Sequence, residues 1–349
     1  METKIVRISI GEIADFEKEL CEAADIIKRG GLVAFPTETV YGLGANALDE
    51  GAAEKIYEAK GRPSDNPLII HIASKEDYDK YCNVENRELL EKIVDAFVPG
   101  PITVIQKKKS IIPDTVTAGM DTVAVRFPSH PIARRLIELS GVPIAAPSAN
   151  TSGRPSPTRA EHVIEDMMGK VDMIIDGGDC EVGLESTIIL LQEDEIKMLR
   201  PGGVTLSDLE GISDKVTLDK AIKEKLSKDE KPLAPGMKYR HYAPVAPVVL
   251  LKGDEDAVRE RLLAEYKKGR TGVIAYAEDG FESGRLVRIL GSKDDKREMA
   301  RSLFDCLRYF DGVGNIDVIY SRLPDEKDIG LAIVNRLIKA SGYTVIEVK

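Results

Sequence analysis

The chain is poor in the residues that build metal centres and disulfide frameworks. Its 349 residues include four cysteines, four histidines and no tryptophan. No cysteine pair has C-x-x-C spacing and the histidines form no cluster, so neither a zinc knuckle nor a redox pair is indicated. Sparse cysteines in a long chain are typical of reduced intracellular thiols. The sequence therefore predicts neither a resident metal nor a disulfide-bonded fold.

Signals for export and membrane insertion are missing as well. Residues 1–20 carry acidic residues among the apolar ones and have no apolar core of the kind that signal peptides contain. No apolar run approaches the length that spans a bilayer. These absences predict a cytoplasmic protein without a membrane partner. The formal net charge of -10 argues against a chain that coats nucleic acid, but it does not exclude a local basic cleft for a nucleotide.

The spacing of apolar residues predicts an α/β chain of two domains. Helices are expected at 13–27, 51–60, 88–97 and 131–140, and strands at 32–36, 68–73, 102–106, 122–127, 143–147, 171–176 and 186–191. Residues 248–348 show a plainer alternation of strands and helices, typical of a small parallel sheet covered by helices. We expect domains at 1–210 and 247–349. The segment 211–246 between them ends in a proline-rich stretch that reads as an ordered linker.

The stretch KGRPSDNPL, residues 60–68, places two cations on stiff backbone. Gly61 suits the left-handed position that ends the helix 51–60. Pro63 and Pro67 exclude a helix interior after it, because proline lacks the amide donor. Lys60 and Arg62 therefore lie on a constrained loop. Two charges that only face solvent would not need so stiff a backbone.

Three further polar loops stand beside predicted strand ends. They are PTETVYGLG (36–44), APSANTSGRPS (146–156), and GLEST with MLRPGG (183–187 and 198–203). In open α/β folds ligands bind at such loops, and arginine forks, a lysine charge and hydroxyls together suit a polyphosphate.

Taken singly, the same residues have ordinary structural explanations. Lys60 could complement a helix end, Ser148 and Asn150 could form turns, and Arg126 could extend along apolar surface. His71 could be a core histidine. The glycines of YGLG read best as a tight turn after a strand, and Thr158 with Glu161 reads as a capping box.

Together, the six motifs resemble the YrdC-type threonylcarbamoyl-AMP synthases over residues 12–206. These motifs are PTETVYGLG, KGRPSDNPL, GPITVI, VAVRFPSHP, APSANTSGRPSPT and LESTI with LRPGG. The stretch PGMKYRHYAP and the C-terminal α/β segment resemble the longer, two-domain members. The resemblance implies a twisted-sheet catalytic domain with a concave cleft, a small Rossmann-like second domain, and a linker over the cleft.

The resemblance also implies an activity. The family makes threonylcarbamoyl-AMP from L-threonine, bicarbonate or CO2, and ATP, with release of pyrophosphate. A partner transferase, met only transiently, then modifies the adenosine beside the tRNA anticodon, and direct tRNA binding by the synthase itself would be weak. Mg2+ would be held mainly by the ATP phosphates, because the sequence shows no carboxylate cluster for it.

The family's paired signature is matched by Lys60-Gly61-Arg62 and Ser148-Ala149-Asn150. By motif match the ATP-binding residues are Lys60, Arg62, Asn66, Thr122, Ser148, Asn150, Ser156, Arg200 and Tyr242, of which Lys60 and Arg62 are the catalytic candidates. The threonine-binding residues are Thr39, His71, Arg126, Ala146 and Thr187, with Arg126 on the carboxylate. The hydroxyls could instead be those of Thr37 and Ser186. Met237, Tyr239, His241 and Tyr242 would form a lid, unless the linker is a passive spacer.

Two other functions are considered. One is an RNA-binding module without chemistry, which the net charge disfavours. The other is an enzyme that adenylates carbamoyl phosphate, as the same domain does in hydrogenase-maturation proteins, although the zinc-finger cysteines of those proteins are missing. The role of the C-terminal domain and the oligomeric state are left open.

Overall fold

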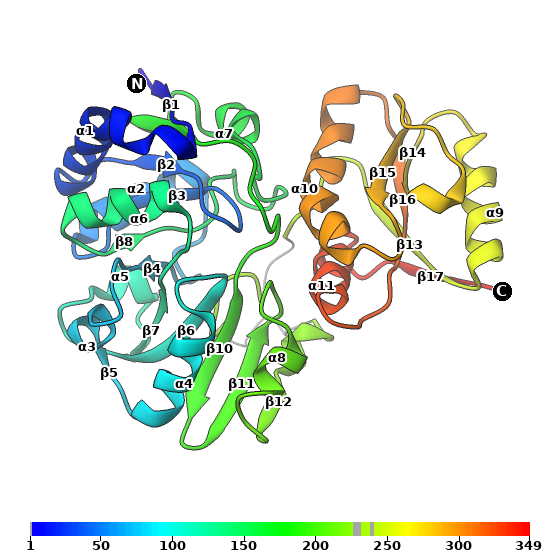
Figure 1. Ribbon diagram of the computed structural model, residues 1–349. Coiled ribbons are helices and arrows are strands. Elements are labelled where there is room, and N and C mark those ends of the chain that lie inside the picture. The colour runs from blue at the N-terminus through cyan, green and yellow to red at the C-terminus, as the bar shows by residue number, and fades with distance from the viewer. Residues whose placement is uncertain (1, 226–231, 238–240) are drawn as a thin grey trace. The chain divides into compact units, whose positions relative to one another are not determined.

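The structure is a computed structural model of the whole chain, and it describes residues 2–225, 232–237 and 241–349. The chain forms two compact units (Figure 1). The first comprises Met1–Ser152, Pro157–Glu181 and Glu185–Lys238, and the second comprises Gly153–Ser156, Val182–Leu184 and Tyr239–Lys349. Two short loops, 153–156 and 182–184, thus group with the second unit although the chain around them builds the first. The boundaries expected at 210 and 246 stay predictions.

The first unit is built on one long mixed sheet. Along the sheet the strands run β1 (Lys4–Arg7), β9 (Met173–Asp176), β2 (Val33–Phe35), β3 (Gly42–Asn46), β8 (Ile144–Ala145), β4 (Ile69–His71), β7 (Thr122–Arg126), β6 (Ile102–Lys108), β10 (Thr187–Gln192), β11 (Glu195–Arg200) and β12 (Val216–Leu218), with β5 (Cys82–Asn83) beside β6. Most of these strands are short and carry apolar residues on both faces, which is typical of a sheet covered on both sides. The predicted α/β class is confirmed.

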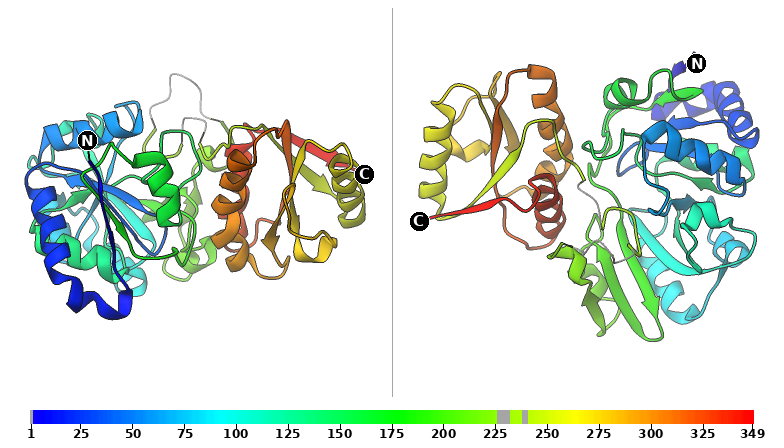
Figure 2. Two further views of the ribbon diagram at one scale, coloured as in Figure 1. Left: turned by 90° about the horizontal axis from the view of Figure 1, so that it is seen from above. Right: turned by 180° about the vertical axis from the view of Figure 1, so that it is seen from behind.

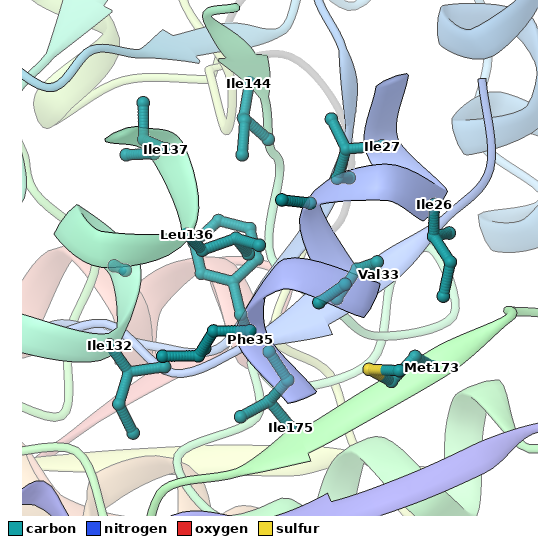
Figure 3. Close-up of a cluster of buried hydrophobic side chains, with 14 of the residues drawn as sticks. Ile26, Ile27, Val33, Phe35, Ile132, Leu136, Ile137, Ile144, Met173 and Ile175 are labelled. Atoms are coloured by element: carbon teal, nitrogen blue, oxygen red, sulfur yellow. The ribbon is translucent and has the colours of Figure 1, made fainter. Parts of the chain in front are cut away.

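Helices surround this sheet and close its core. They are α1 (Glu17–Lys28), α2 (Glu50–Lys60), α3 (Asp77–Tyr81), α4 (Arg87–Phe97), α5 (Asp114–Thr117), α6 (Pro131–Ser140), α7 (Ala160–Met167) and α8 (Leu206–Glu210), with the 3-10 helices Ile10–Phe16 and Lys220–Ile222. Figure 3 shows α1 and α6 packing isoleucines and leucines around Phe35 of β2. Each such side chain stabilises the fold by about 1.5–3 kcal/mol when fully buried. The helix expected from residue 13 starts instead as the 3-10 turn and becomes α-helical at Glu17.

Glycines shape the backbone at two of the motif loops. Gly61 ends α2 with φ 61°, as the sequence predicts. Gly42 and Gly44, which were expected in a turn, lie instead inside β3. The reason is close packing, since a Cβ on Gly44 would stand 2.7 Å from Cε1 of Phe35 and 2.8 Å from Cγ2 of Ile144.

The second unit is a five-stranded sheet in which every pair is parallel. The strand order is β15 (Val287–Gly291), β14 (Thr271–Tyr276), β16 (Val318–Arg322), β13 (Val248–Gly253) and β17 (Val345–Val348). Helix α9 (Glu255–Tyr266) covers one face, and α10 (Lys296–Val313) with α11 (Gly330–Ala340) covers the other (Figures 1 and 2). This arrangement confirms the predicted small parallel α/β unit.

The capping box expected at Thr158 and Glu161 is wrong. Helix α7 begins at Ala160, with Arg159 at the N-cap and no side-chain cap hydrogen bond there. The Thr158 amide donates instead to Nδ1 of His162, at 3.3 Å. The ring of His162, in the first turn of the helix, therefore accepts the amide that the Glu161 carboxylate would have accepted in a capping box. Among the described residues, no helix is long and apolar enough to cross a bilayer.

Candidate active site

Strand register places one row of polar side chains across the first sheet. His71 on β4 pairs with Arg126 on β7, and Arg126 pairs with Thr103 on β6. Thr103 pairs with Ile188 on β10, which in turn pairs with Arg200 on β11. Directly paired residues have their side chains on the same face of a sheet. Two cations, a histidine and a hydroxyl from distant motifs therefore share one face.

The neighbouring positions on this face are apolar and are covered by the linker. Ile69, Ala124 and Ile105 stand two residues away from His71, Arg126 and Thr103, so they point the same way. Ala234 and Met237 of the linker are buried against them. Thr122 lies on the same face, further along β7, and is half-buried. Ala234 and Met237, in the described linker segment 232–237, thus lie on the face that carries the polar row.

Arg200 ties the linker to the end of β10. Its side chain is 4% exposed. Nε and Nη2 donate to the carbonyl and hydroxyl oxygens of Ser186 at 3.0 and 3.2 Å, and Nη1 donates to the carbonyl of Pro235 at 3.3 Å. The guanidinium thereby links the LEST loop, β11 and the linker.

The adjacent hydroxyls of Ser186 and Thr187 serve different partners. The Ser186 hydroxyl lies 2.7 Å from that of Thr103, on the face of the polar row. The Thr187 hydroxyl donates to the carbonyl of Val204 at 2.6 Å and accepts from its amide at 3.0 Å. Because successive strand residues point to opposite faces, only one of the two can face the linker side. The geometry thus favours Ser186, and the predicted role of Thr187 stays untested.

Lys60 joins the two signature motifs. It stands at the end of α2, is 2% exposed, and directs Nζ at the loop after β8. There Nζ donates to the carbonyls of Ser148 and Asn150, the latter at 2.6 Å, and approaches Oδ1 of Asn150 at 3.5 Å. The Ser148 hydroxyl donates to the same Oδ1 at 2.5 Å. A buried lysine charge therefore holds the Ser148–Asn150 loop in shape.

Arg62 acts in the same way on its own loop. Nε and Nη2 donate to the carbonyl of Asn66 at 3.2 and 3.1 Å, and Nη2 also donates to that of Pro67 at 2.8 Å. The Oδ1 atom of Asn66 is buried and has no hydrogen-bond partner among the described residues. A buried polar atom without a partner is rare in proteins, which marks Asn66 as a place where a ligand can donate.

The loop after β2 brings a carboxylate to Arg126. Oε1 of Glu38 lies 2.8 Å from Nη2 of Arg126, and both side chains are almost fully buried. Thr37 adds a longer contact, with its hydroxyl 3.5 Å from the same Nη2. The hydroxyl of Thr39 lies 2.9 Å from that of Thr37. Burial raises the pKa of Glu38, but the Arg126 guanidinium and the amides of Glu38 and Ser129 together hold that pKa below its usual value.

His71 is a neutral histidine in the wall of the same region. Its ring meets that of Phe35 edge-on, with centroids 6.4 Å apart. Burial first, and the Arg126 guanidinium second, lower the pKa of His71 to about 3. Nδ1 is buried without a hydrogen-bond partner in the described part of the chain. Ala146 lies close by, with its amide bonded to the carbonyl of Ile69 at 2.9 Å.

Two predicted ATP-binding residues belong to the second unit. Ser156 lies in the short loop 153–156 that is part of that unit and is buried. Tyr242 has φ 65° and stacks on Phe304 of α10, with ring centroids 5.2 Å apart. Arg336 of α11 lies 5.6 Å from the same ring. The proposed lid residue Tyr239 lies outside the described residues, so its placement is left aside.

The structure gathers part of the predicted residues into two groups and adds three residues to them. His71, Arg126, Thr122 and Arg200 share the linker face, while Lys60 joins Ser148 and Asn150. Sequence reasoning did not include Thr103, Glu38 or Ser186 among the site residues, although Ser186 was the stated alternative. The motif PTETVYGLG contains Glu38, but its pairing with Arg126 depends on contacts far apart in the sequence.

The described residues offer little to a resident metal ion. No group of three or more histidine, cysteine, aspartate or glutamate side chains in that part of the chain lies close enough to hold one.

Comparison with known proteins gives matches along nearly the whole chain. A family model described as "Telomere recombination" matches residues 25–202, and one described as "Threonylcarbamoyl-AMP synthase, C-terminal domain" matches residues 204–342. The threonylcarbamoyl-AMP synthase of Pyrococcus abyssi is 51% identical over 331 residues, which cover 93% of this chain and 95% of that one. The synthase of Bacillus subtilis is 43% identical, with 96% of each chain covered. The crystal structure of P. abyssi Sua5 complexed with L-threonine superposes with a TM-score of 0.90 at 47% identity, covering 99% of this chain and 100% of that one.

Buried cations, hydroxyls and a neutral histidine on one face of a mixed sheet are typical of an α/β protein with a site for small charged ligands. The comparisons name the kind of enzyme. The chain belongs to the threonylcarbamoyl-AMP synthase family, in its two-domain form, and is a threonylcarbamoyl-AMP synthase by class. The class of enzyme that the motifs imply, a threonylcarbamoyl-AMP synthase, is thereby confirmed.

Proposed function

We propose that the protein condenses L-threonine, bicarbonate or CO2, and ATP into threonylcarbamoyl-AMP and pyrophosphate. The product would serve threonylcarbamoylation of the adenosine beside the tRNA anticodon, through a partner transferase in the cytoplasm. Of the three functions considered from the sequence, family membership supports this one. The substrate assignment rests on one observation. His71, Arg126 and Thr103 place a neutral ring, a cation and a hydroxyl, in that order, on one face of the sheet.

The chemistry needs no protein nucleophile. The neutral amine of threonine adds to CO2 and loses a proton, which gives a carbamate. A carbamate oxygen then attacks the α-phosphorus of ATP, the bond to the bridging oxygen breaks, and pyrophosphate leaves. Reactions of this kind are accelerated by positioning and by charge stabilisation. We assign the threonine carboxylate to Arg126, and the pocket wall to His71, Ala146 and the hydroxyls of Thr39 and Ser186 or Thr187.

The nucleotide is assigned to the loops around Lys60. We assign phosphate and nucleoside contacts to Arg62, Asn66, Thr122, Ser148, Asn150, Ser156, Arg200 and Tyr242. The hydrogen bonds of Lys60 and Arg62 to loop carbonyls support a refined role, in which these cations shape the phosphate-binding backbone as well as supplying charge. A loop that is already ordered loses less entropy when the nucleotide binds.

The linker is assigned as a cover over the site. Ala234 and Met237 lie on the sheet face that carries the polar row, and Arg200 holds Pro235 in place. Excluding water at this face would protect a product that water hydrolyses readily.

Pyrophosphate release tests the proposal. It is measured with ATP and bicarbonate, with and without L-threonine, on the wild-type chain and on Lys60→Ala. Release that requires threonine and collapses in the variant is the expected result. Release that ignores threonine would point to another acceptor, and tRNA binding without any release would contradict the proposed synthesis.

A further inference from the structure

The ion pair between Glu38 and Arg126 is almost fully buried in the wall of the candidate site. Its side chains are 6% and 5% exposed, and the contact is 2.8 Å long. Removing two charges from water is costly, and the attraction between them repays this only when their other hydrogen-bonding groups are also satisfied. Here they are not, which makes the pair incomplete as a purely structural element.

The unmet groups lie on both partners. Neither carboxylate oxygen of Glu38 has a hydrogen bond of regular geometry to another described residue, although the amides of Glu38 and Ser129 face the carboxylate. Nε of Arg126 is also buried without a partner in the described part of the chain. A carboxylate can accept about four hydrogen bonds and a guanidinium can donate five. The pair therefore keeps both acceptors and donors for a third group.

The other ionisable groups around Glu38 carry no charge that could complete the pair. Burial lowers the pKa of His130 to about 4, so its ring is neutral near pH 7. Burial raises the pKa of the Cys180 thiol, so that group stays protonated. The neighbouring Thr37 offers a hydroxyl that already donates to the carbonyl of Val40 at 2.7 Å. A completing group must therefore bring its own anion and its own N–H donors, close together.

An α-amino acid has this pattern, because its carboxylate and its amino group are attached to one carbon. We propose that Glu38 receives the amino group of the threonine substrate while Arg126 receives its carboxylate, and that Glu38 sets the requirement for an amino acid. The inference rests on the proposed function and assigns a binding role to a residue that the motif comparison leaves out. Glu38 also keeps Arg126 in place, but that role alone would leave the hydrogen-bonding capacity of both partners only partly used.

The test compares two ligands on the full chain by calorimetry. One is L-threonine, and the other is its 2-hydroxy analogue, in which a hydroxyl replaces the amino group. The wild type should prefer threonine. In Glu38→Gln the affinity for threonine should fall roughly tenfold to a hundredfold, as expected for one charge-assisted hydrogen bond, while affinity for the analogue changes little. The preference for the amino group is then lost.

Two variants keep the test decisive. Glu17→Gln alters a glutamate of the same type, which pairs with Arg135 at a half-exposed site, and should leave both affinities unchanged. Glu38→Asp keeps the charge and should keep the preference at weaker affinity, and it decides the matter if Glu38→Gln does not fold. Equal weakening of both ligands by Glu38→Gln, or no weakening of either, would overturn the inference. A wild-type chain that binds no threonine at all would instead overturn the proposed function.

Discussion

Replacing Lys60 by methionine should damage the fold as well as the reaction. Methionine preserves most of the buried volume but removes the ammonium group, so the carbonyls of Ser148 and Asn150 lose their donor in a buried place. A hydrogen bond to a charged group contributes about 1.5–3 kcal/mol, and the relief of burying a charge offsets part of the loss. We expect a net destabilisation of about 2–4 kcal/mol, or roughly 5–15 °C in the melting temperature of a unit of this size.

Thermal denaturation and threonine-dependent pyrophosphate release, measured on the same samples, separate the two effects. Lys55→Met is the matched control, because Lys55 lies on the same helix, is exposed, and donates to one carbonyl, that of Gly30, at 2.6 Å. It should melt within about 3 °C of the wild type, as expected for less than 1 kcal/mol. If Lys60→Met keeps the wild-type melting temperature and loses only turnover, Lys60 acts on the substrate alone and the reasoning about the loop is refuted.

Three further predictions concern packing, acid stability and the linker. Gly44→Ala should destabilise the first unit by about 1–3 kcal/mol, because the new Cβ would meet Phe35 and Ile144. Gly312→Ala has open space around its Cβ and should stabilise the protein by about 0.5–1 kcal/mol. Urea denaturation that shows equal effects of the two substitutions would contradict the packing argument. His71 has a folded-state pKa of about 3 against 6.5 unfolded, so the stability it contributes is complete above pH 6.5 and falls as the pH drops towards 4, by up to about 1.4 kcal/mol per pH unit. His71→Gln should flatten this fall, and an unchanged slope would argue against a buried neutral ring. Met237 is buried on the sheet face, so Met237→Gln should lower the yield of threonylcarbamoyl-AMP per pyrophosphate released. Leu233→Gln, at an exposed linker position, should leave this yield unchanged. Equal yields from the two variants would favour a passive spacer.

Local patterns in the sequence predict most of the elements, because helix periodicity and glycine stops act over a few residues. Gly61 is an example, since a left-handed residue after a helix needs only its own backbone freedom. The same local reasoning fails at Gly44, where Phe35 and Ile144 approach from other strands. It fails again at Thr158, where the ring of His162 accepts the amide that a capping box would have satisfied. In each case a contact outside the motif decides the outcome.

The candidate site shows the same limit more sharply. The motifs place Arg126 and Thr187 near a ligand, but only the register of β4, β7, β6 and β10 shows which side chains share a face. That register puts Ser186 beside Thr103 and commits the Thr187 hydroxyl to Val204. The pairing of Glu38 with Arg126 is likewise a tertiary contact that no spacing in the sequence indicates.

A crystal structure of the full chain with L-threonine bound would test the central claim most directly. The predicted result is a threonine on the sheet face that carries His71, Arg126 and Thr103, with its carboxylate within hydrogen-bond distance of Arg126 and its amino group within reach of Glu38. A threonine bound away from this face, or one that leaves the Glu38–Arg126 pair untouched, would contradict the account.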